Sequence, residues 1–366
     1  MRKRKAGTRD RRPIQRSVTQ HPFSELQENI VRAMQFTGPG EPLAAVEVPP
    51  PVAKPGWVVI DVEAAGMCHS DCTIVDGPGV NWLSHYPIIL GHEVAGTVAS
   101  LGEGVTAFEI GDRVAVCLRA GRDEAGATLG PGTHEGPDGG SAPGLHVDGG
   151  YAEQCMVRAS RLMHIPEGVS FEVAAVTTDA VVTAFHAVRT TGDVRLGDTV
   201  AIIGLGGLGI NAVRIAHLCG GKVFGVDVNE STFPAAIEAG ARQCFTDIAA
   251  LKDLKPSVII DFAGVSVTTD QAVKIAPPEA RVVLVGLGAD TMVLATSPFV
   301  TKKIRLLSSL GGSREDLELA YEQIAEGNLL PAVQEFAFED INEAMELLRQ
   351  GKATARLFTR PRKETS

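Results

Sequence analysis

The sequence contains few cysteines and no long hydrophobic stretch. Its 6 cysteines are scattered over 366 residues, which does not match a disulfide framework, so we expect a reducing, cytoplasmic setting. No apolar run reaches the ~18 residues needed to span a membrane, and the longest candidate, residues 200–210, is interrupted by four glycines. The first thirty residues carry no apolar segment of the signal-peptide type. These absences, with a hydrophobic fraction of 44%, predict a soluble globular protein without a membrane partner.

Positive charge is scarce outside one short segment. Residues 1–33 hold nine Lys and Arg against three Asp and Glu, whereas the remainder holds 25 against 41. An acidic body argues against nucleic acid as the main partner. The basic segment can be interpreted as a targeting or anion-binding arm, but we favour a disordered extension that lies outside the fold.

The rest of the chain consists of a β-rich segment followed by a segment in which strands and helices alternate. A length of 366 residues predicts about two domains. In the first half, residues 57–62, 94–98 and 111–116 have the pattern of β-strands joined by glycine-rich turns, as in a partly closed barrel. Residues 121–150 form a predicted loop with ten glycines, and a loop of that length is usually functional or mobile.

After residue 198 the pattern changes to alternating strands and helices. The predicted strands are 199–203, 222–226, 258–261 and 281–286, and the first predicted helix is 208–219. Apolar strands that alternate with helices indicate a doubly wound parallel sheet. Residues 341–358 then return to a helix followed by a strand.

A glycine motif, Gly204-x-Gly206-x-x-Gly209, lies between the first of these strands and the helix. Gly204 permits a tight turn, Gly206 lets the backbone approach a pyrophosphate, and Gly209 allows close packing of helix and strand. Asp227 ends the next strand, 18 residues on, where a carboxylate accepts both ribose hydroxyls. Because no Arg or Lys follows Asp227 directly to hold a 2′-phosphate, the sequence predicts NAD rather than NADP.

Candidate metal ligands lie upstream. The segments Cys68-His69-Ser70-Asp71 and Gly91-His92-Glu93 place a thiolate, an imidazole and several carboxylates within twenty-six residues. A metal centre and a dinucleotide site on one chain indicate metal-assisted hydride transfer between an alcohol and a nicotinamide. Together these motifs resemble the zinc-dependent alcohol dehydrogenases of the medium-chain dehydrogenase/reductase family, over residues 34–359.

The resemblance implies an α/β fold of two domains. A GroES-like, partly open β-barrel catalytic domain would span residues 34–185 plus 320–366, and a Rossmann domain would span 186–319, with the tail 1–33 outside. Members of the family usually form homodimers or homotetramers, often through the edge strand of the dinucleotide sheet, for which residues 281–287 are our candidate.

The resemblance also assigns the metal ligands and the proton acceptor. Cys68 and His92 would bind one catalytic zinc per chain, with Asp179 as the third ligand. Glu93, which polyol dehydrogenases of the family can use directly, is the alternative third ligand. Asp71 would accept from the other nitrogen of His92 and fix its tautomer. Ser70 would accept the alcohol proton, the alternative being a plain turn hydroxyl.

Further cofactor contacts follow from the same resemblance. Leu208, which with Gly207 belongs to the glycine motif, and Thr183 would back the nicotinamide ring. Arg356 would reach the pyrophosphate. His69 matches a position that faces the phosphates, although a surface contact within the domain is an ordinary alternative.

Two departures from the family pattern affect these expectations. Many members place a relay histidine five residues after the metal cysteine, where this chain has Thr73. Many members also carry four closely spaced cysteines that bind a structural zinc, whereas here Cys117 is followed by none until Cys155. We therefore expect no second zinc. The remaining thiols are predicted to be core or surface groups: Cys72, Cys117, Cys155, Cys219 and Cys244.

Two other functions compete with the leading one. A metal-free quinone or enoyl reductase of the same superfamily would lack the pair of Cys68 and His92, and an NAD-binding protein without activity would have no reason to keep Ser70. The sequence does not identify the substrate. The candidates for lining the pocket are Trp82, Tyr86 and the loop 121–150, and polyol, aromatic, aliphatic and acyl-CoA-linked alcohols all remain possible.

Overall fold

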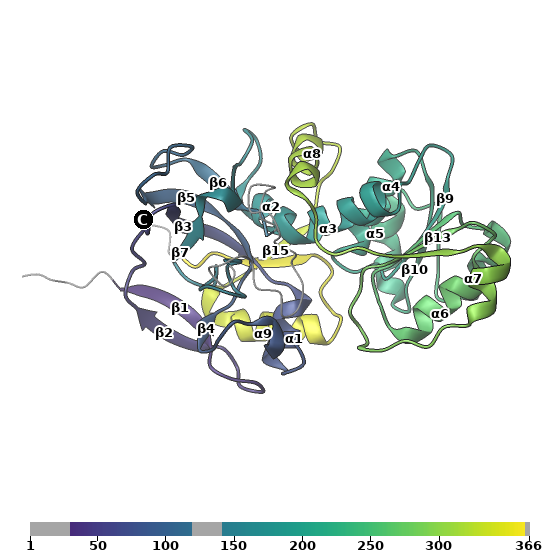
Figure 1. The fold of residues 1–366 in the computed structure, drawn as a ribbon, viewed down its shortest axis with the longest axis horizontal. Helices are drawn as coiled ribbons and strands as arrows, with labels where there is room; N and C mark the ends of the chain where they lie inside the picture. Colours follow the sequence, from purple (N-terminus) through teal and green to yellow (C-terminus); the bar gives the residue numbers. More distant parts are fainter. Residues whose placement is uncertain (1–29, 119–140, 363–366) are drawn as a thin grey trace, which may run out of the picture.

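The computed structural model describes residues 30–118 and 141–362, and these form two domains joined by a group of helices (Figure 1). The expected loop 121–150 lies outside the described residues except for 141–150, and most of the expected tail lies outside as well. The first strand, β1 (Val31–Phe36), begins three residues before the expected start of the fold. It pairs with β2, so residues 31–33 belong to the folded domain.

The first domain, which was expected to be the catalytic one, contains two sheets. A three-stranded sheet has the order β2-β1-β4, and the larger sheet has the order β15-β16-β3-β5-β6-β8, with β7 also paired to β3. The strands not yet bounded are β2 (Ala44–Val48), β3 (Trp57–Gly66), β4 (Ile88–Ile89), β5 (Glu93–Leu101), β6 (Arg113–Val116), β7 (Gln154–Arg158), β8 (Leu162–His164), β15 (Val333–Phe336) and β16 (Arg356–Thr359). The predicted strands 57–62, 94–98 and 111–116 are thus confirmed, with β6 starting at Arg113.

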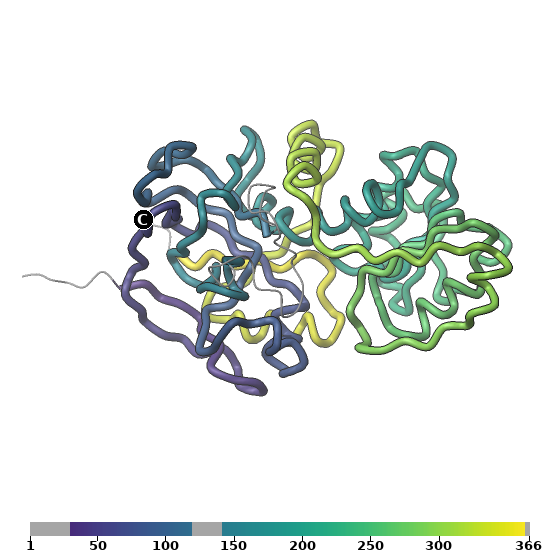
Figure 2. Tube along the Cα trace, viewed as in Figure 1, coloured from purple at the N-terminus to yellow at the C-terminus, as the bar shows by residue number. Residues whose placement is uncertain are grey.

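The last part of the chain returns to the catalytic domain, where it lies among the segments of the first half (Figure 2). Strand β16 pairs antiparallel with β3, with Phe358 opposite Gly66, and parallel with β15. Helix α9 (Ile341–Arg349) packs against α1 (His69–Val75). The predicted helix and strand within 341–358 are therefore confirmed.

The second domain is a six-stranded parallel sheet with the order β11-β10-β9-β12-β13-β14. Its strands are β9 (Thr199–Ile203), β10 (Lys222–Val226), β11 (Gln243–Phe245), β12 (Val258–Asp261), β13 (Arg281–Leu284) and β14 (Arg305–Ser308). Its helices are α4 (Gly209–Leu218), α5 (Phe233–Glu238), α6 (Ser266–Ile275) and α7 (Thr296–Lys302). The doubly wound parallel sheet is confirmed.

The edge of this sheet is not where we expected it. Strand β13, within the predicted edge segment 281–287, pairs on both sides, with β12 and with β14. Strand β14 is the edge strand on that side of the sheet, and β11 is the edge strand on the other side. The sequence of β14, Arg-Leu-Leu-Ser, is partly exposed and has polar residues at both ends, whereas the equally short strands β12 and β13 are mostly buried and apolar and were predicted.

Helices connect the two domains. The segment Phe171–Thr191 is one continuous helical run, α2 (Phe171–Val176), the π-helical turn η4 (Thr177–Val181), α3 (Val182–Phe185) and η5 (His186–Thr191). By length and composition it could cross a membrane, but 72% of its apolar 18-residue window is buried inside the protein, as in the core helix of a globular fold. Its apolar residues belong to a core that continues from Ala64 and Ala95 of the catalytic sheet to Ile202 of the parallel sheet.

The second connection runs through α8 (Arg314–Ala325), so the domain boundary expected at residue 320 falls inside a helix. Asp316 ties this helix to the first connection. Its carboxylate is 2.7 Å from His186 Nδ1 and accepts a hydrogen bond from Thr190 at 2.8 Å. Burial would raise the pKa of Asp316, but its hydrogen bonds, the strongest from His186, lower it below the usual range.

Candidate metal and dinucleotide sites

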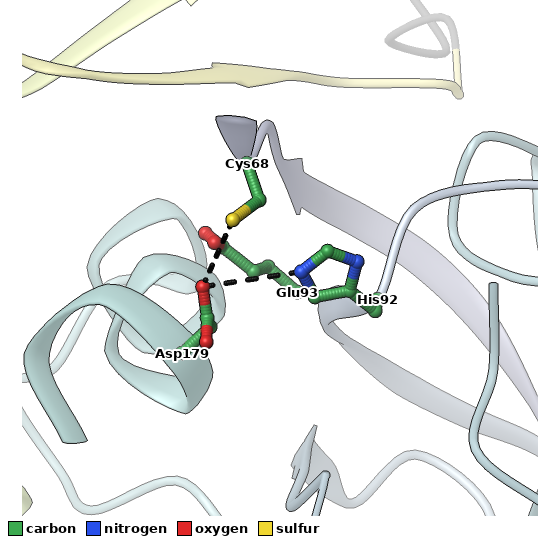
Figure 3. Close-up of side chains that lie close together, drawn as sticks. All are labelled: Cys68, His92, Glu93 and Asp179. Carbon is green, nitrogen blue, oxygen red and sulfur yellow. Dashed lines mark hydrogen bonds and ion pairs between the residues drawn. The ribbon is translucent and has the colours of Figure 1, made fainter. Parts of the chain in front are cut away.

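Four potential metal ligands converge between the catalytic sheet and the connecting helix (Figure 3). Cys68 follows β3, His92 directly precedes β5, Glu93 is the first residue of β5, and Asp179 belongs to the π-helical turn η4. One donor atom from each lies within 4.8 Å of the others. Turns of π-helix are rare and often occur at functional sites, and this one carries a ligand candidate.

Asp179 Oδ2 is at the centre of the cluster. It is 3.3 Å from Cys68 Sγ and 3.9 Å from His92 Nε2, while Thr183 donates to the other oxygen, Oδ1, at 3.2 Å. Burial would raise the pKa of Asp179, but hydrogen bonding with His92 and the charge of Arg356 lower it far below its usual range. Ser70 Oγ lies 3.5 Å from His92 Nε2, at the edge of the cluster.

The second ring nitrogen of His92 is close to a buried carboxylate. His92 Nδ1 is 3.4 Å from Asp71 Oδ1, and both residues are almost fully buried. Burial lowers the pKa of His92, but the negative charge of Asp71, together with hydrogen bonding to Asp179, Asp71 and Cys68, raises it well above its usual value. Asp71 Oδ2 accepts from the backbone N–H of Cys68 at 3.0 Å and from the Tyr151 hydroxyl at 2.8 Å. No motif in the sequence singles out Tyr151.

Arg356, at the start of β16, joins the cluster to the dinucleotide loop. Its guanidinium donates to both carboxylate oxygens of Glu93 and, at 2.9 Å, to Asp179 Oδ2. Arg356 is also next to Gly207, since a Cβ on that glycine would lie 3.7 Å from Arg356 Cδ. Burial raises the pKa of Glu93, and the positive charge of Arg356 opposes that shift. The family resemblance predicts Arg356 at the pyrophosphate, but it does not indicate the contacts of Arg356 with the carboxylates of Glu93 and Asp179.

His69 and Thr73 lie on helix α1, beside the cluster. His69 is exposed, and desolvation together with the charge of Arg356 lowers its pKa. Thr73 Oγ1 donates to the carbonyl of His69 at 3.1 Å, a bond within its own helix. Of the two candidate pocket residues, Trp82 packs on the catalytic core, and Tyr86 contacts the Phe36 ring edge-on at 5.8 Å.

The glycine motif forms a strand–turn–helix unit between β9 and α4, as predicted. Gly204 has φ of +86°, in the left-handed region that favours glycine. A Cβ on Gly209 would come within 1.8 Å of the Gly204 carbonyl oxygen, so helix and turn pack too closely for a side chain. A Cβ on Gly206 would meet nothing within 4 Å, which leaves open space against the backbone. Leu208 precedes the first residue of the helix.

Asp227 follows β10 and faces this turn. One of its oxygens accepts from the backbone N–H of Leu205 at 2.6 Å, and the other accepts from that of Asn229 at 2.8 Å. The carboxylate is therefore fixed at the carboxyl end of the sheet, where ligands of doubly wound folds bind.

A barrel-type catalytic domain, a parallel sheet with a glycine-rich turn, and a mixed thiol, imidazole and carboxylate cluster between them define a two-domain dehydrogenase. Residues 54–167 match the family model of the alcohol dehydrogenase GroES-like domain, and residues 207–326 match that of the zinc-binding dehydrogenases. The chain is 32% identical over 332 residues to an alcohol dehydrogenase of Geobacillus stearothermophilus, covering 87% of this chain and 96% of the relative. It belongs to the zinc-type alcohol dehydrogenases of the medium-chain dehydrogenase/reductase family.

Solved structures agree with this family. Acetophenone reductase from Geotrichum candidum in complex with NAD matches with a TM-score of 0.82 and 30% identity, covering 92% of this chain and 98% of that one. A thermostable alcohol dehydrogenase from Pyrobaculum aerophilum matches with a TM-score of 0.80 and 28% identity, covering 91% and 100%. The expected combination of a GroES-like domain and a Rossmann domain is confirmed.

Proposed function

We propose that this protein is a zinc-dependent, NAD-linked alcohol dehydrogenase that interconverts an alcohol and the corresponding aldehyde or ketone. The convergence of Cys68, His92, Glu93 and Asp179, next to a dinucleotide-binding turn, is the observation that carries the proposal. A metal-free quinone or enoyl reductase would not need this group of metal-type ligands. Family membership and the named alcohol dehydrogenase relatives support the oxidoreductase activity.

The donor set fits zinc. Catalytic zinc sites in proteins use three ligands of thiolate, imidazole and carboxylate type around an open fourth position. In this chain His92 Nδ1 and Asp71 Oδ1 are both buried without a hydrogen-bond partner of good geometry. A metal bound at His92 Nε2 would orient the imidazole, and the hydrogen bond from Nδ1 to Asp71 would then become shorter. Zinc would supply Lewis-acid polarisation of the alcohol or carbonyl oxygen.

Asp179 is our proposed third ligand, beside Cys68 and His92. Arg356 engages both carboxylate oxygens of Glu93 but only Oδ2 of Asp179, and that oxygen lies close to Cys68 Sγ, at 3.3 Å, and to His92 Nε2, at 3.9 Å. The alternative is the arrangement of a polyol-type dehydrogenase with Glu93 as the ligand, because the Glu93 carboxylate belongs to the same cluster. A matched pair of variants separates them. Asp179→Asn should lose zinc, whereas Glu93→Gln should retain it.

Ser70 is the proposed acceptor of the alcohol proton. Its hydroxyl is at the edge of the cluster and can relay a proton outward. Thr73 contributes little to that relay, since its hydroxyl is bonded within helix α1. Water or a ribose hydroxyl of the cofactor would then carry the proton on to solvent.

NAD is the proposed cofactor, with its pyrophosphate against Gly206 and the start of α4, where free backbone N–H groups favour anions. The adenosine ribose would hydrogen-bond Asp227. Arg356 is near enough to Gly207 to neutralise the pyrophosphate while retaining a carboxylate partner. Thr183, Leu208 and His69 keep the roles expected for them, at the nicotinamide ring and the phosphates.

Several finer statements belong to the same proposal. We infer one zinc per chain, because Cys68 and its neighbours are the group of metal-type ligands found among residues 30–118 and 141–362. A small alcohol or carbonyl compound is the substrate, and no nucleic acid or membrane is a partner. Association into homodimers or homotetramers would use the edge strand β14, in place of the segment 281–287.

The test is a panel of primary, secondary and polyol alcohols with NAD or NADP, with NADH or NADPH formation as the readout and elemental analysis of the purified protein. We expect alcohol-dependent NADH formation and close to one zinc per chain. Activity that persists in zinc-free protein would contradict the metal assignment, and equal kcat/KM for NAD and NADP would contradict the cofactor assignment.

A further inference from the structure

Tyr151 makes buried contacts beside the metal site, and the proposed reaction uses none of them. It follows the glycine-rich segment 141–150, and its side chain is fully buried. Its hydroxyl lies 2.8 Å from Asp71 Oδ2 and 3.3 Å from the carbonyl oxygen of Gly66. A phenol has one proton to donate, and the shorter contact, with a carboxylate, is the stronger bond. The hydroxyl therefore donates to Asp71.

The phenol ring contacts the metal site in a second place. Gly91, which precedes His92, has φ of +90°, and a Cβ there would lie 2.6 Å from the Tyr151 ring. The ring is thus packed directly against the backbone that carries His92. One side chain touches both the main chain next to the imidazole and the carboxylate that faces the imidazole.

The contacts of Asp71 divide between its two oxygens. Oδ2 is held by two donors, the Cys68 backbone N–H and the Tyr151 hydroxyl, and Oδ1 faces His92 Nδ1 at 3.4 Å. Because Oδ2 is held, Oδ1 is directed at the imidazole. Burial beside Asp71 raises the pKa of Tyr151 well above its usual value, which keeps the phenol protonated and able to donate.

We propose that Tyr151 is a positioning residue for the metal site: it holds Asp71 so that Asp71 orients His92 for metal binding. This inference rests on the proposed function and deepens it, since it adds a residue that sets metal affinity without touching metal, cofactor or substrate. Partners of metal-binding histidines typically contribute about 10- to 100-fold to metal affinity. Tyr151 acts one hydrogen bond further out, so we expect about 10-fold.

The experiment compares the wild type, Tyr151→Phe and Tyr321→Phe. Tyr321 is the matched control, because it is also fully buried and its hydroxyl donates to one acceptor, the Ala174 carbonyl, at 2.9 Å. Zinc release from the full-length protein to a chromogenic chelator gives the rate and the affinity. We expect about 10-fold faster release and weaker binding from Tyr151→Phe, and an unchanged rate from Tyr321→Phe. Cobalt-substituted Tyr151→Phe should also show a changed visible spectrum.

A double-mutant cycle tests the route through Asp71. In an Asp71→Asn background, Tyr151→Phe should have no further effect on zinc release. Equal release by wild type and Tyr151→Phe, an equal effect of the two Tyr→Phe changes, or a full Tyr151→Phe effect in the Asp71→Asn background would each overturn the inference. Any of these three results would contradict the role of Tyr151 and leave the proposed function intact. Wild-type protein that takes up no zinc would contradict both the role of Tyr151 and the proposed function.

Discussion

The metal cluster and the dinucleotide turn are built in opposite ways. The turn comes from six consecutive residues, Gly204–Gly209. It presents mainly backbone groups to a ligand, and the absence of side chains at its glycines leaves room for that ligand. The cluster is made of side chains from separate elements, and Cys68 and Asp179 are 111 positions apart in the sequence. A site made of backbone depends on one local turn, whereas a site made of side chains depends on the packing of a whole domain. Changes at the two sites should therefore be separable, except at residues that touch both.

The largest effect should come from Cys68→Ser, which tests this separation directly. Loss of the thiolate removes one of three proposed ligands, so we expect zinc and activity to be lost together, essentially completely. NADH binding, measured by fluorescence titration, should change little because the turn is local. Cys155→Ser is the control, since Cys155 is a buried thiol that donates to the Asp148 carbonyl. If NADH binding falls in parallel with zinc content, the two sites are not independent.

Ser70→Ala should be next in size. It removes the proposed proton acceptor but no metal ligand, so zinc content should stay at the wild-type level. A positioned proton-transfer group contributes about 10²- to 10⁴-fold, and kcat for alcohol oxidation should drop by that factor. A deuterated alcohol reports whether hydride transfer is still being observed. An unchanged kcat would mean that the proton leaves by a different route.

A smaller effect is expected at the dinucleotide site from Asp227→Gly combined with Asn229→Arg. Losing a charge-assisted hydrogen bond to the ribose costs about 1.5–3 kcal/mol, or roughly 10- to 100-fold in affinity. The ratio of kcat/KM for NAD to that for NADP should fall by at least this much, and zinc content should not change. A variant that retains the wild-type preference would show that Asp227 does not select the cofactor.

Thr73→Val should have the smallest effect. The Thr73 hydroxyl is bonded within its own helix, and water can replace it in a proton relay. We expect a change in kcat far smaller than that of Ser70→Ala. Because a hydroxyl has no pKa near neutrality, the pH profile of the wild type should show no separate relay imidazole. A loss as large as that of Ser70→Ala would make Thr73 an obligatory link.

The same contrast explains what the sequence could predict. The turn, its flanking strand and helix, and Asp227 follow from neighbouring residues, and they were predictable to within one or two positions. The assembly of Cys68, His92 and Asp179 came from family resemblance, because no local rule brings together residues so far apart. The Arg356 contact with Glu93 spans 263 positions, and the Tyr151 contact with Asp71 spans 80. Such pairs depend on strand pairing across the domain and leave no periodic signal in the sequence.

The position of β16 has a consequence for the order in which the protein matures during synthesis. Domains generally fold as units while the chain emerges from the ribosome. The parallel sheet comes from one continuous stretch, β9 to β14, and is complete in the nascent chain before Arg356 is made. Glu93 emerges much earlier, but its cationic partner arrives only when β16 pairs with β3. The dinucleotide turn can therefore fold first, whereas the metal cluster and the contact of Arg356 beside Gly207 are completed only when β16 has been made.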